Sequence, residues 1–373
     1  MLIGVPREIK SEEYRVGLTP ESVKSLVSHG HRVLVETGAG PGIGAGDADY
    51  AAAGATVVAT ASSIWATADL IVKVKEPQPD ERRQLRAGQV LFTYLHLASD
   101  AAQAQDLAES GATCIAYETV TDVQGRLPLL APMSEVAGRM SIQVGAHFLE
   151  ATQGGRGVLL AGATGVDPAK VVVLGAGVSG INAARVAAAM GAEVTVLDRS
   201  AAALARLDAL TGGTVRGVPA DADAIARHVV QADLVVGAVL VPGDAAPRLI
   251  DRSLLGRMQR GAVIVDIAID QGGCCETSRP TTHRAPTFVV DGIVHYCVAN
   301  MPGAVPRTST YALNHATAPF VLALAERGAA AALRHDPHLR AGLNVHRGQV
   351  THPGVARALG MAAVDPLTAI DQP

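Results

Sequence analysis

Residues 171–198 constrain the fold of this chain most strongly. They read VVVLGAGVSGINAARVAAAMGAEVTVLD, in which Gly175, Gly177 and Gly180 have the spacing G-x-G-x-x-G. The glycines follow a short apolar strand pattern, open an alanine-rich helical pattern, and precede a second strand pattern that ends at Asp198. In this β–α–β context the first glycine makes a tight turn, the second lets the main chain approach a pyrophosphate, and the third lets helix pack on strand. The stretch predicts an α/β unit that binds a dinucleotide.

Asp198 indicates which dinucleotide the unit binds. It lies 23 residues after Gly175, near the place where a carboxylate hydrogen-bonds the adenosine ribose hydroxyls. A carboxylate at this position repels a 2′-phosphate. The sequence therefore favours NAD over NADP, although the neighbouring Arg199 works against that preference.

Alternating strand and helix patterns extend over most of the chain and predict two parallel sheets with helices on both faces. The first series of strand patterns covers 2–6, 32–36, 70–74, 90–95 and 113–117, and the second covers 171–174, 193–198, 214–218, 234–240, 262–268 and 295–299. A helical pattern connects the two series, another runs over 310–327, and the tail contains a hairpin-like LNVHRGQVTH.

The length of 373 residues also exceeds the ~250–300 residues at which single cores stop growing. We expect an α/β protein of two Rossmann-like, doubly wound parallel-sheet domains linked by long helices, with the active site in the cleft between them. The predicted domains are a discontinuous substrate domain, 1–127 plus 304–373, and an NAD-binding domain, 128–303.

Composition excludes several classes of partner. The net charge is −4 with no basic block, which argues against nucleic acid or an anionic membrane as the main partner. No run reaches ~18 consecutive apolar residues, and the first ten residues do not resemble a secretory signal. The four cysteines show neither CxxC nor a disulfide-framework spacing, and free thiols suit a reducing compartment. We therefore expect a cytoplasmic protein.

Ionisable residues just after the predicted strands mark a candidate site, because ligands of open α/β sheets bind at the carboxyl ends of strands. Arg15 lies in the loop after the first strand, Lys75 and His96 follow two later strands, and Asp270 follows the strand pattern at 262–268. Arginine holds a carboxylate in a bidentate fork, and histidine transfers protons near neutral pH. Beside a nicotinamide, this set suits a small anionic keto acid.

The stretch VIVDIAIDQGGCCETSRPTTH, residues 263–283, allows three interpretations. It could be a metal site, a redox thiol pair, or a buried strand that delivers Asp270 to a cleft. Adjacent cysteines rarely chelate one metal, and the spacing to His283 matches no zinc pattern. We expect Cys274 and Cys275 to pack as small apolar residues, and Asp266, within the strand, to accept a structural hydrogen bond.

Several long motifs together resemble L-alanine dehydrogenase. They are MLIGVPREIKSEEYRVGLTP, KVKEPQP, LFTYLHLA, LGAGVSGINAARVAAAMGAEVTVLD, DIAIDQGGCCETSRPTTH and HYCVANMPGAVPRTST. The likeness runs from residue 1 into the tail and agrees in order and spacing, which is far more specific than the glycine fingerprint alone.

The resemblance implies reversible NAD-linked oxidative deamination of L-alanine to pyruvate and ammonia, in a homohexamer. It implies that Arg15 and Lys75 hold the substrate and that His96 and Asp270 are the catalytic residues. Cofactor contacts carried over from the family pattern fall on Ser134, Val178, Ser179, Asp198, Val239, Leu240, Ile267, Ala268, Ile269, Asp270, Arg279, Val298, Ala299, Asn300 and Met301. Some relatives are credited with a metal held by the counterpart of Glu118 and a late-helix histidine. Because this chain has no matching histidine, we predict no metal.

Two other functions remain as alternatives. The NAD-binding component of a proton-translocating transhydrogenase is similar across both domains, and a non-catalytic NAD-sensing protein could use the same fold. The strand-end residues Lys75, His96 and Asp270 favour amino-acid chemistry over both.

Overall fold

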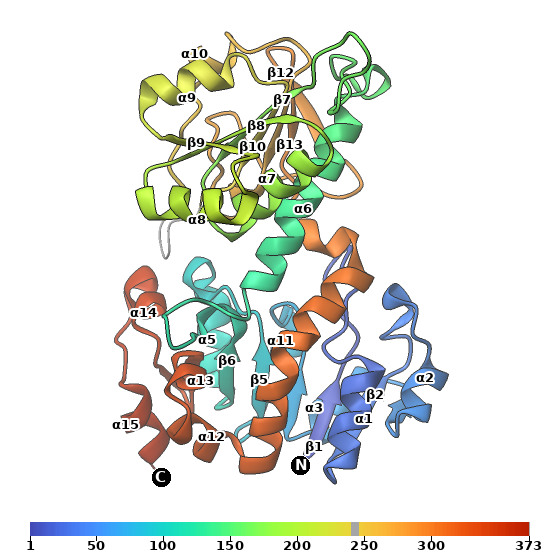
Figure 1. The fold of residues 1–373 in the computed structure, drawn as a ribbon. Helices are drawn as coiled ribbons and strands as arrows, with labels where there is room; N and C mark the ends of the chain where they lie inside the picture. Colours follow the sequence, from blue (N-terminus) through green and yellow to red (C-terminus); the bar gives the residue numbers. More distant parts are fainter. Residues whose placement is uncertain (240–245, 373) are drawn as a thin grey trace. The chain divides into compact units, whose positions relative to one another are not determined.

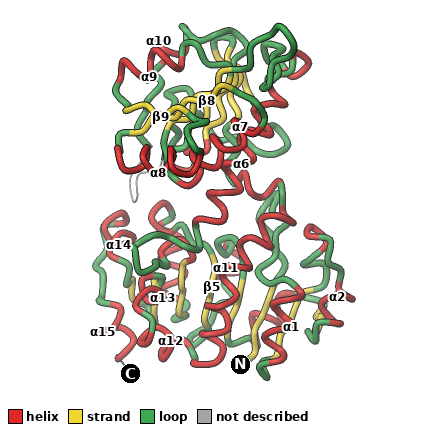
Figure 2. The backbone as a smooth tube through the Cα atoms, viewed as in Figure 1, coloured by secondary structure: helices red, strands yellow, loops and turns green. Residues whose placement is uncertain are grey.

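The computed structural model describes residues 1–239 and 246–372 (Figure 1). The chain divides into two compact units, unit 1 (Met1–Met133 with Val305–Pro373) and unit 2 (Ser134–Ala304). The domain boundaries predicted from the sequence, 127/128 and 303/304, stay a prediction. In each unit the helices lie against the strands of one sheet (Figure 2).

Unit 1 is built on a sheet that has eight strands in the described part of the chain, in the order β15-β14-β6-β5-β4-β1-β2-β3. Strands β1 to β6 pair in parallel, whereas β14 is antiparallel to β6 and β15 to β14. Their bounds are β1 Leu2–Val5, β2 Arg32–Glu36, β3 Thr56–Val58, β4 Leu70–Val72, β5 Val90–Thr93, β6 Thr113–Ala116, β14 Leu343–His346 and β15 Gln349–Val350.

The helices of unit 1 begin where local sequence signals place them. Thr19 caps the first helix by accepting the Ser22 N–H at 3.3 Å, and Pro20 occupies the first helical position. The helices are α1 Pro20–Ser28, α2 Asp47–Ala52, α3 Ala61–Thr67, α4 Pro79–Arg82, α5 Ala101–Glu109, α11 Pro306–Arg327, α12 Ala329–His335, α13 Pro337–Ala341, α14 Pro353–Leu359 and α15 Pro366–Asp371. A buried cluster that includes Trp65 and Leu91 forms part of the core of this unit.

Unit 2 contains a seven-stranded sheet within its described residues, in the order β12-β13-β11-β10-β7-β8-β9. All neighbours pair in parallel except the edge strand β12. The strands are β7 Lys170–Leu174, β8 Glu193–Asp198, β9 Arg216–Pro219, β10 Leu234–Gly237, β11 Val263–Asp266, β12 Thr287–Val290 and β13 Ile293–Tyr296. The helices are α6 Ala131–Phe148, which begins in unit 1, α7 Val178–Ala189, α8 Ala201–Thr211, α9 Ala222–Val229 and α10 Arg252–Leu255.

The predicted fold class is confirmed, because both sheets are mostly parallel and both follow the doubly wound order 3-2-1-4-5-6 across their six parallel strands. Several predicted strand ends are wrong. The patterns that run to residues 74, 95, 268 and 299 correspond to strands that stop at Val72, Thr93, Asp266 and Tyr296. The pattern at 262–268 predicts a strand throughout, but β11 stops at Asp266 and the chain turns into a 3₁₀-helix, Ile267–Gln271.

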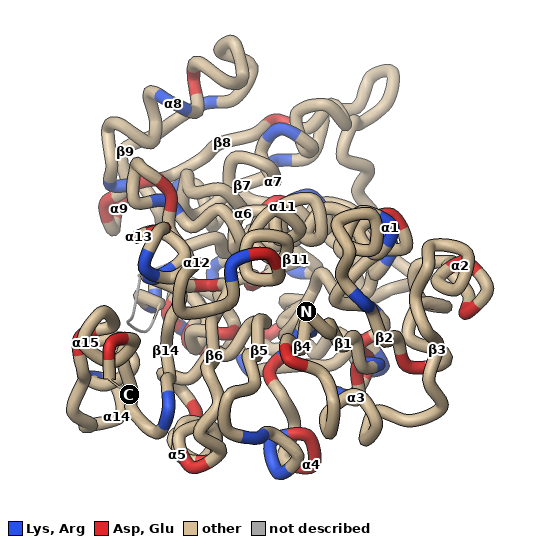
Figure 3. The backbone as a smooth tube through the Cα atoms, turned by 90° about the horizontal axis from the view of Figure 1, so that it is seen from below, with Lys and Arg blue, Asp and Glu red and all other residues tan. Residues whose placement is uncertain are grey.

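Charged residues of both signs are interspersed along the described backbone (Figure 3). No single helix among the described residues is long and apolar enough to cross a membrane. Helices α11 and α12 would be long and apolar enough only if they were counted as one helix, but their axes differ by 118°.

Candidate active site

The glycine loop between β7 and α7 has the geometry that its spacing predicts. Gly175 has a φ of 104°, which a residue with a side chain rarely adopts. A Cβ on Gly180 would overlap the carbonyl oxygen of Gly175, so only glycine lets α7 approach the strand this closely. Nothing in the protein lies within 4 Å of a Cβ built on Gly177, which leaves room for a ligand at the start of α7. A helix N-terminus with exposed N–H groups attracts a pyrophosphate.

Asp198, the last residue of β8, lies directly against this loop. Its Oδ2 accepts the Ala176 N–H at 2.6 Å, and its Oδ1 accepts the Ser200 N–H at 2.7 Å. A carboxylate offers about four acceptor positions, so these two bonds leave capacity for ribose hydroxyls. The structure therefore brings together the glycines and the carboxylate that the sequence motif pairs.

The other expected cofactor residues of unit 2 mostly follow strands of the same parallel sheet. Val239 comes after β10, and its N–H lies near Gly175. Val298, Ala299, Asn300 and Met301 come after β13, and Ser134 lies in α6. Parallel strands end at one edge of a sheet, so the topology gathers the positions that follow strands, Val239 and Val298 to Met301, at the edge that carries the glycine loop. Leu240 lies outside the described residues.

Arg279 has a partner that sequence reasoning did not predict. Its guanidinium lies 4.3 Å from the centroid of the Phe288 ring. This contact is a cation–π interaction within unit 2 and holds an exposed arginine against strand β12.

The stretch after β11 differs from the predicted strand end. Asp270 is exposed on the 3₁₀-helix rather than at the last position of a strand, and Gly272 and Gly273, at φ 92° and 82°, redirect the chain. Asp266 has the structural role expected of it, since its Oδ2 accepts the Cys274 N–H at 2.9 Å and the Ser278 O–H at 2.6 Å.

The adjacent cysteines are buried, free thiols. Burial raises the pKa of Cys274 well above its usual value, which keeps the thiol protonated and unreactive. No group of three or more His, Cys, Asp or Glu residues in the described ranges is arranged to hold a metal ion. The absence of a metal in the functional protein stays a prediction.

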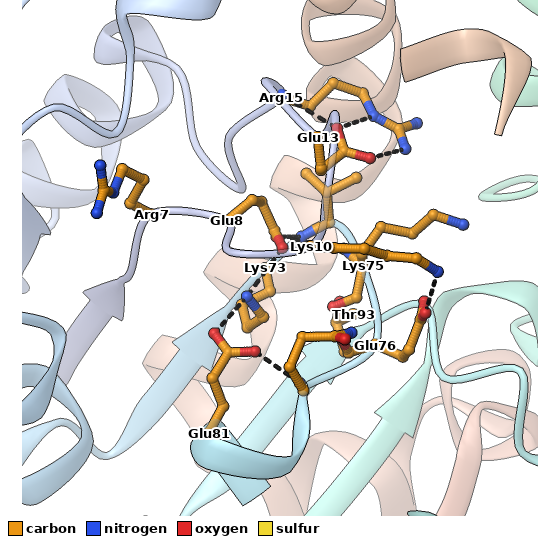
Figure 4. A network of polar contacts seen from close by, with 12 residues as sticks. Arg7, Glu8, Lys10, Glu13, Arg15, Lys73, Lys75, Glu76, Glu81 and Thr93 are labelled. Atoms are coloured by element: carbon orange, nitrogen blue, oxygen red, sulfur yellow. Dashed lines mark hydrogen bonds and ion pairs between the residues drawn. The ribbon is translucent and has the colours of Figure 1, made fainter. Parts of the chain in front are cut away.

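The arginine and lysine expected to hold the substrate lie in a dense polar network of unit 1 (Figure 4). Arg15 is only 2% exposed, so it is not an ordinary loop cation. Its Nε and Nη2 donate to the two carboxylate oxygens of Glu13 at 2.7 and 2.6 Å, and its Nη1 contacts the Met133 sulfur at 3.1 Å. Lys75 lies in the segment that follows β4, beside the buried Lys73. Because β4 ends at Val72, both lysines lie beyond the end of the strand.

His96 is exposed and does not lie in the core. It has a φ of 52°, in the left-handed region, and its N–H donates to Oε1 of Glu118 at 2.6 Å. Both oxygens of Glu118 also accept the Leu95 N–H at 3.2 Å. Glu118 therefore holds the loop that presents His96.

Tyr94 connects the residues around the candidate site in unit 1, and sequence reasoning missed it. Its ring stacks on His96 with centroids 5.7 Å apart, and its hydroxyl donates to the Leu129 carbonyl at 2.6 Å. Burial raises the pKa of Tyr94, and the nearby charge of Arg15 only partly offsets this. Because Tyr94 is close to both, Arg15 and His96 belong to one region of unit 1. The sequence signal that could have indicated Tyr94 is its position two residues before His96, in the strand pattern at 90–95.

Comparisons with known proteins agree with this geometry. Residues 4–137 match the family model "Alanine dehydrogenase/PNT, N-terminal domain", and residues 141–353 match "Alanine dehydrogenase/PNT, C-terminal domain". An alanine dehydrogenase from Halomonas elongata is 58% identical over 365 residues, 98% of each chain.

Two solved structures have the same architecture. An L-alanine dehydrogenase aligns with a TM-score of 0.93 at 51% identity, over 96% of this chain and 99% of that one. A transhydrogenase from Sinorhizobium meliloti aligns with a TM-score of 0.82 at 29% identity, over 94% of this chain and 100% of that one. The predicted resemblance is thus confirmed over nearly the full length, and the chain belongs to the alanine dehydrogenase/PNT family.

Proposed function

We propose that this chain catalyses the reversible, NAD-dependent oxidative deamination of L-alanine to pyruvate and ammonia. The observation that carries the proposal is that one chain of this family contains two features. One is a complete dinucleotide loop with Asp198 against it, and the other is a charged cluster around Arg15. Identity to the proteins named alanine dehydrogenase is far higher than to the transhydrogenase, so the dehydrogenase activity is favoured over that alternative.

The proposed substrate residues act through charge and proton transfer. Arg15 binds the substrate carboxylate, and Lys75 binds the oxygen of the carbonyl group. His96 and Asp270 move the protons that accompany exchange of the carbonyl oxygen for ammonia. The nicotinamide supplies the hydride transfer when bound.

The proposed cofactor site uses unit 2. Asp198 selects NAD by bonding the ribose hydroxyls, and the N-terminus of α7 binds the pyrophosphate. The remaining proposed contacts are Ser134, Val178, Ser179, Val239, Leu240, Ile267, Ala268, Ile269, Asp270, Arg279, Val298, Ala299, Asn300 and Met301. We also propose a cytoplasmic homohexamer, which light scattering would identify as six copies of the 38.2-kDa chain.

Ammonium dependence tests the reaction. Purified protein should oxidise NADH in the presence of pyruvate only when ammonium is added, because ammonia must first replace the carbonyl oxygen of pyruvate to give the imine that is reduced. A lactate-type enzyme would not need ammonium, and a transhydrogenase component or an NAD sensor would show no turnover in either condition. Oxidation of NADH by pyruvate alone would contradict the proposal.

The same assay tests the catalytic assignment. Asp270→Asn should lower kcat by ~10²–10⁴-fold if Asp270 transfers protons. Near-normal turnover in this variant, with an unchanged KM for NADH, would remove Asp270 from the mechanism.

A further inference from the structure

The segment that carries Lys75 is held by side chains although it lies beyond the end of β4. The three main-chain N–H groups from Lys73 to Lys75 all have acceptors. The Lys73 N–H donates to the Phe92 carbonyl at 3.2 Å. The N–H groups of Val74 and Lys75 both donate to Oε1 of Glu8, at 2.7 and 3.2 Å. One carboxylate oxygen thus replaces the two strand hydrogen bonds that the chain loses here.

The carbonyl side of the segment is equally complete. The three carbonyl oxygens accept, in order, from the Tyr117 hydroxyl at 3.0 Å, the Tyr94 N–H at 3.2 Å and the Thr93 hydroxyl at 2.9 Å. All six polar main-chain groups of the segment therefore have a partner, and backbone rotation at Lys75 would break several bonds at once.

Glu8 is held in turn by a buried cation. Its Oε2 lies 2.9 Å from the Lys73 ammonium, which lies 2.8 Å from Oε1 of Glu81. The side chain of Lys73 is 0% exposed, and those of Glu8 and Glu81 are 2% and 4% exposed. The other oxygen of Glu81 accepts the Gln78 N–H at 2.7 Å, at the start of α4. Burial favours a neutral Lys73, but the two carboxylates outweigh it and raise its pKa, so the ammonium is kept.

We propose that Glu8 is a positioning residue, whose carboxylate fixes the main chain at Lys75 and so holds the Lys75 ammonium where the substrate binds, with Lys73 and Glu81 orienting Glu8 in turn. Glu8 comes from the loop after β1 and Lys75 from the loop after β4, and the pairing of these two strands brings the loops together (Figure 4). This inference rests on the proposed function, in which Lys75 binds pyruvate. It gives Lys73, two residues away, a supporting role instead of a substrate role.

The test compares two replacements of Glu8 in the full-length protein. Glu8→Leu removes the acceptor for both N–H groups, whereas Glu8→Gln keeps a carbonyl oxygen that can accept them, and in both Lys73 retains Glu81. Glu8→Leu should raise the KM for pyruvate at least about tenfold, the equivalent of ~1.4 kcal/mol, with the KM for NADH unchanged. Glu8→Gln should raise the KM for pyruvate much less. Asp106→Leu, which removes the acceptor of the Arg82 Nε–H at 2.7 Å elsewhere in unit 1, is the matched control and should change neither KM.

A second variant covers the case in which Glu8→Leu does not fold. Thr93→Val is nearly isosteric and removes only the bond to the Lys75 carbonyl, so it should raise the KM for pyruvate in the same direction by a smaller factor. The inference is overturned if the KM for pyruvate is unchanged in Glu8→Leu, or in Thr93→Val when Glu8→Leu does not fold. It is also overturned if Glu8→Leu and Glu8→Gln raise the KM for pyruvate equally. The same holds if the variants lower only kcat, because a smaller fraction of active protein would explain that result. Failure of the wild-type protein to consume pyruvate with ammonium would instead overturn the proposed function.

Discussion

Lys73 and Lys75 show how the surroundings of a residue decide its role. Their side chains are chemically identical and two positions apart, yet Lys73 is paired with two buried carboxylates while Lys75 follows it in the segment that Glu8 holds. The buried cluster carries two carboxylates and one ammonium, so removing Lys73 would leave uncompensated negative charge in the core. Sequence position alone favoured Lys75 as the substrate ligand, but it did not indicate the partners of Lys73.

The Arg15–Glu13 pair permits a direct prediction on stability. Both side chains are almost fully buried, at 2% and 0% exposure, so Glu13→Ala should lower the free energy of unfolding by about 3 kcal/mol, as loss of one partner leaves a buried charge. Asp80→Ala is the control, because the Arg83–Asp80 pair is 70% and 77% exposed and such pairs contribute at most ~1 kcal/mol. Urea denaturation measures both. Equal losses in the two variants would mean that burial of the pair has no energetic consequence.

At the scale of elements, the turn from β7 into α7 depends on two glycines for different reasons. Gly180→Ala should lower the thermal midpoint and abolish NADH binding, because the new Cβ overlaps the Gly175 carbonyl oxygen. At Gly177 a Cβ would meet open space, and the φ of −74° suits any residue. The variant Gly177→Ala should therefore keep a thermal midpoint near that of the wild type. It should still weaken NADH binding at least about tenfold, or ~1.4 kcal/mol, because the methyl group occupies the pyrophosphate path. Fluorescence titration measures the affinity of each variant for NADH. Normal affinity in Gly177→Ala would contradict binding of the pyrophosphate at this turn.

Helix α14 gives a prediction for pH. Its first turn is capped by His352, whose Nδ1 accepts the Val355 N–H at 3.3 Å, and burial lowers the pKa of His352 below 6.5, with Glu118 partly offsetting this. Since the folded state binds the proton less readily than the unfolded state, this contribution to stability is complete above pH 6.5 and is lost as the pH falls through the folded-state pKa.

His352→Asn separates this contribution from the others, because asparagine caps helices well and does not titrate. The fall in denaturation midpoint from about pH 7.5 to about pH 5.5 should be smaller in the variant than in the wild type. The same pH slope in both proteins would show that His352 does not contribute.

At the scale of the whole molecule, two units with the same parallel strand order carry different residues of the proposed mechanism. Unit 1 contains Arg15, Lys75 and His96, and unit 2 contains the dinucleotide loop and Asp270. Each unit has its own buried core, and the single tryptophan, Trp65, lies in that of unit 1.

Trp65 allows the units to be observed separately during unfolding. NAD⁺ at 100 times its Kd should stabilise the unit that binds it by ~2.7 kcal/mol. We therefore expect the calorimetric transition of unit 2 to rise while the Trp65 emission transition of unit 1 moves less. Coincident transitions that rise together would indicate that the chain unfolds as one cooperative block.

Local patterns along the chain account for much of the fold. Apolar runs predicted most strands of both sheets, and the glycine spacing predicted the loop, because these signals depend on residues close together in the sequence. The short edge strands β3 and β12 were missed because their residues are only partly buried and form no clear apolar run. The 3₁₀-helix under Asp270 was missed because its apolar residues continue the pattern of β11.

The sequence by itself determined the fold class, the dinucleotide loop and the choice of Arg15, Lys75, His96 and Asp270 as candidates. Only the tertiary structure decided which groups surround them within each unit: Glu13 on Arg15, Glu8 beneath Lys75, and Tyr94 and Glu118 around His96. Glu8 and Lys75 are 67 positions apart and meet because β1 pairs with β4 rather than only with its neighbour in sequence. Such contacts follow from strand order, which local periodicity does not contain.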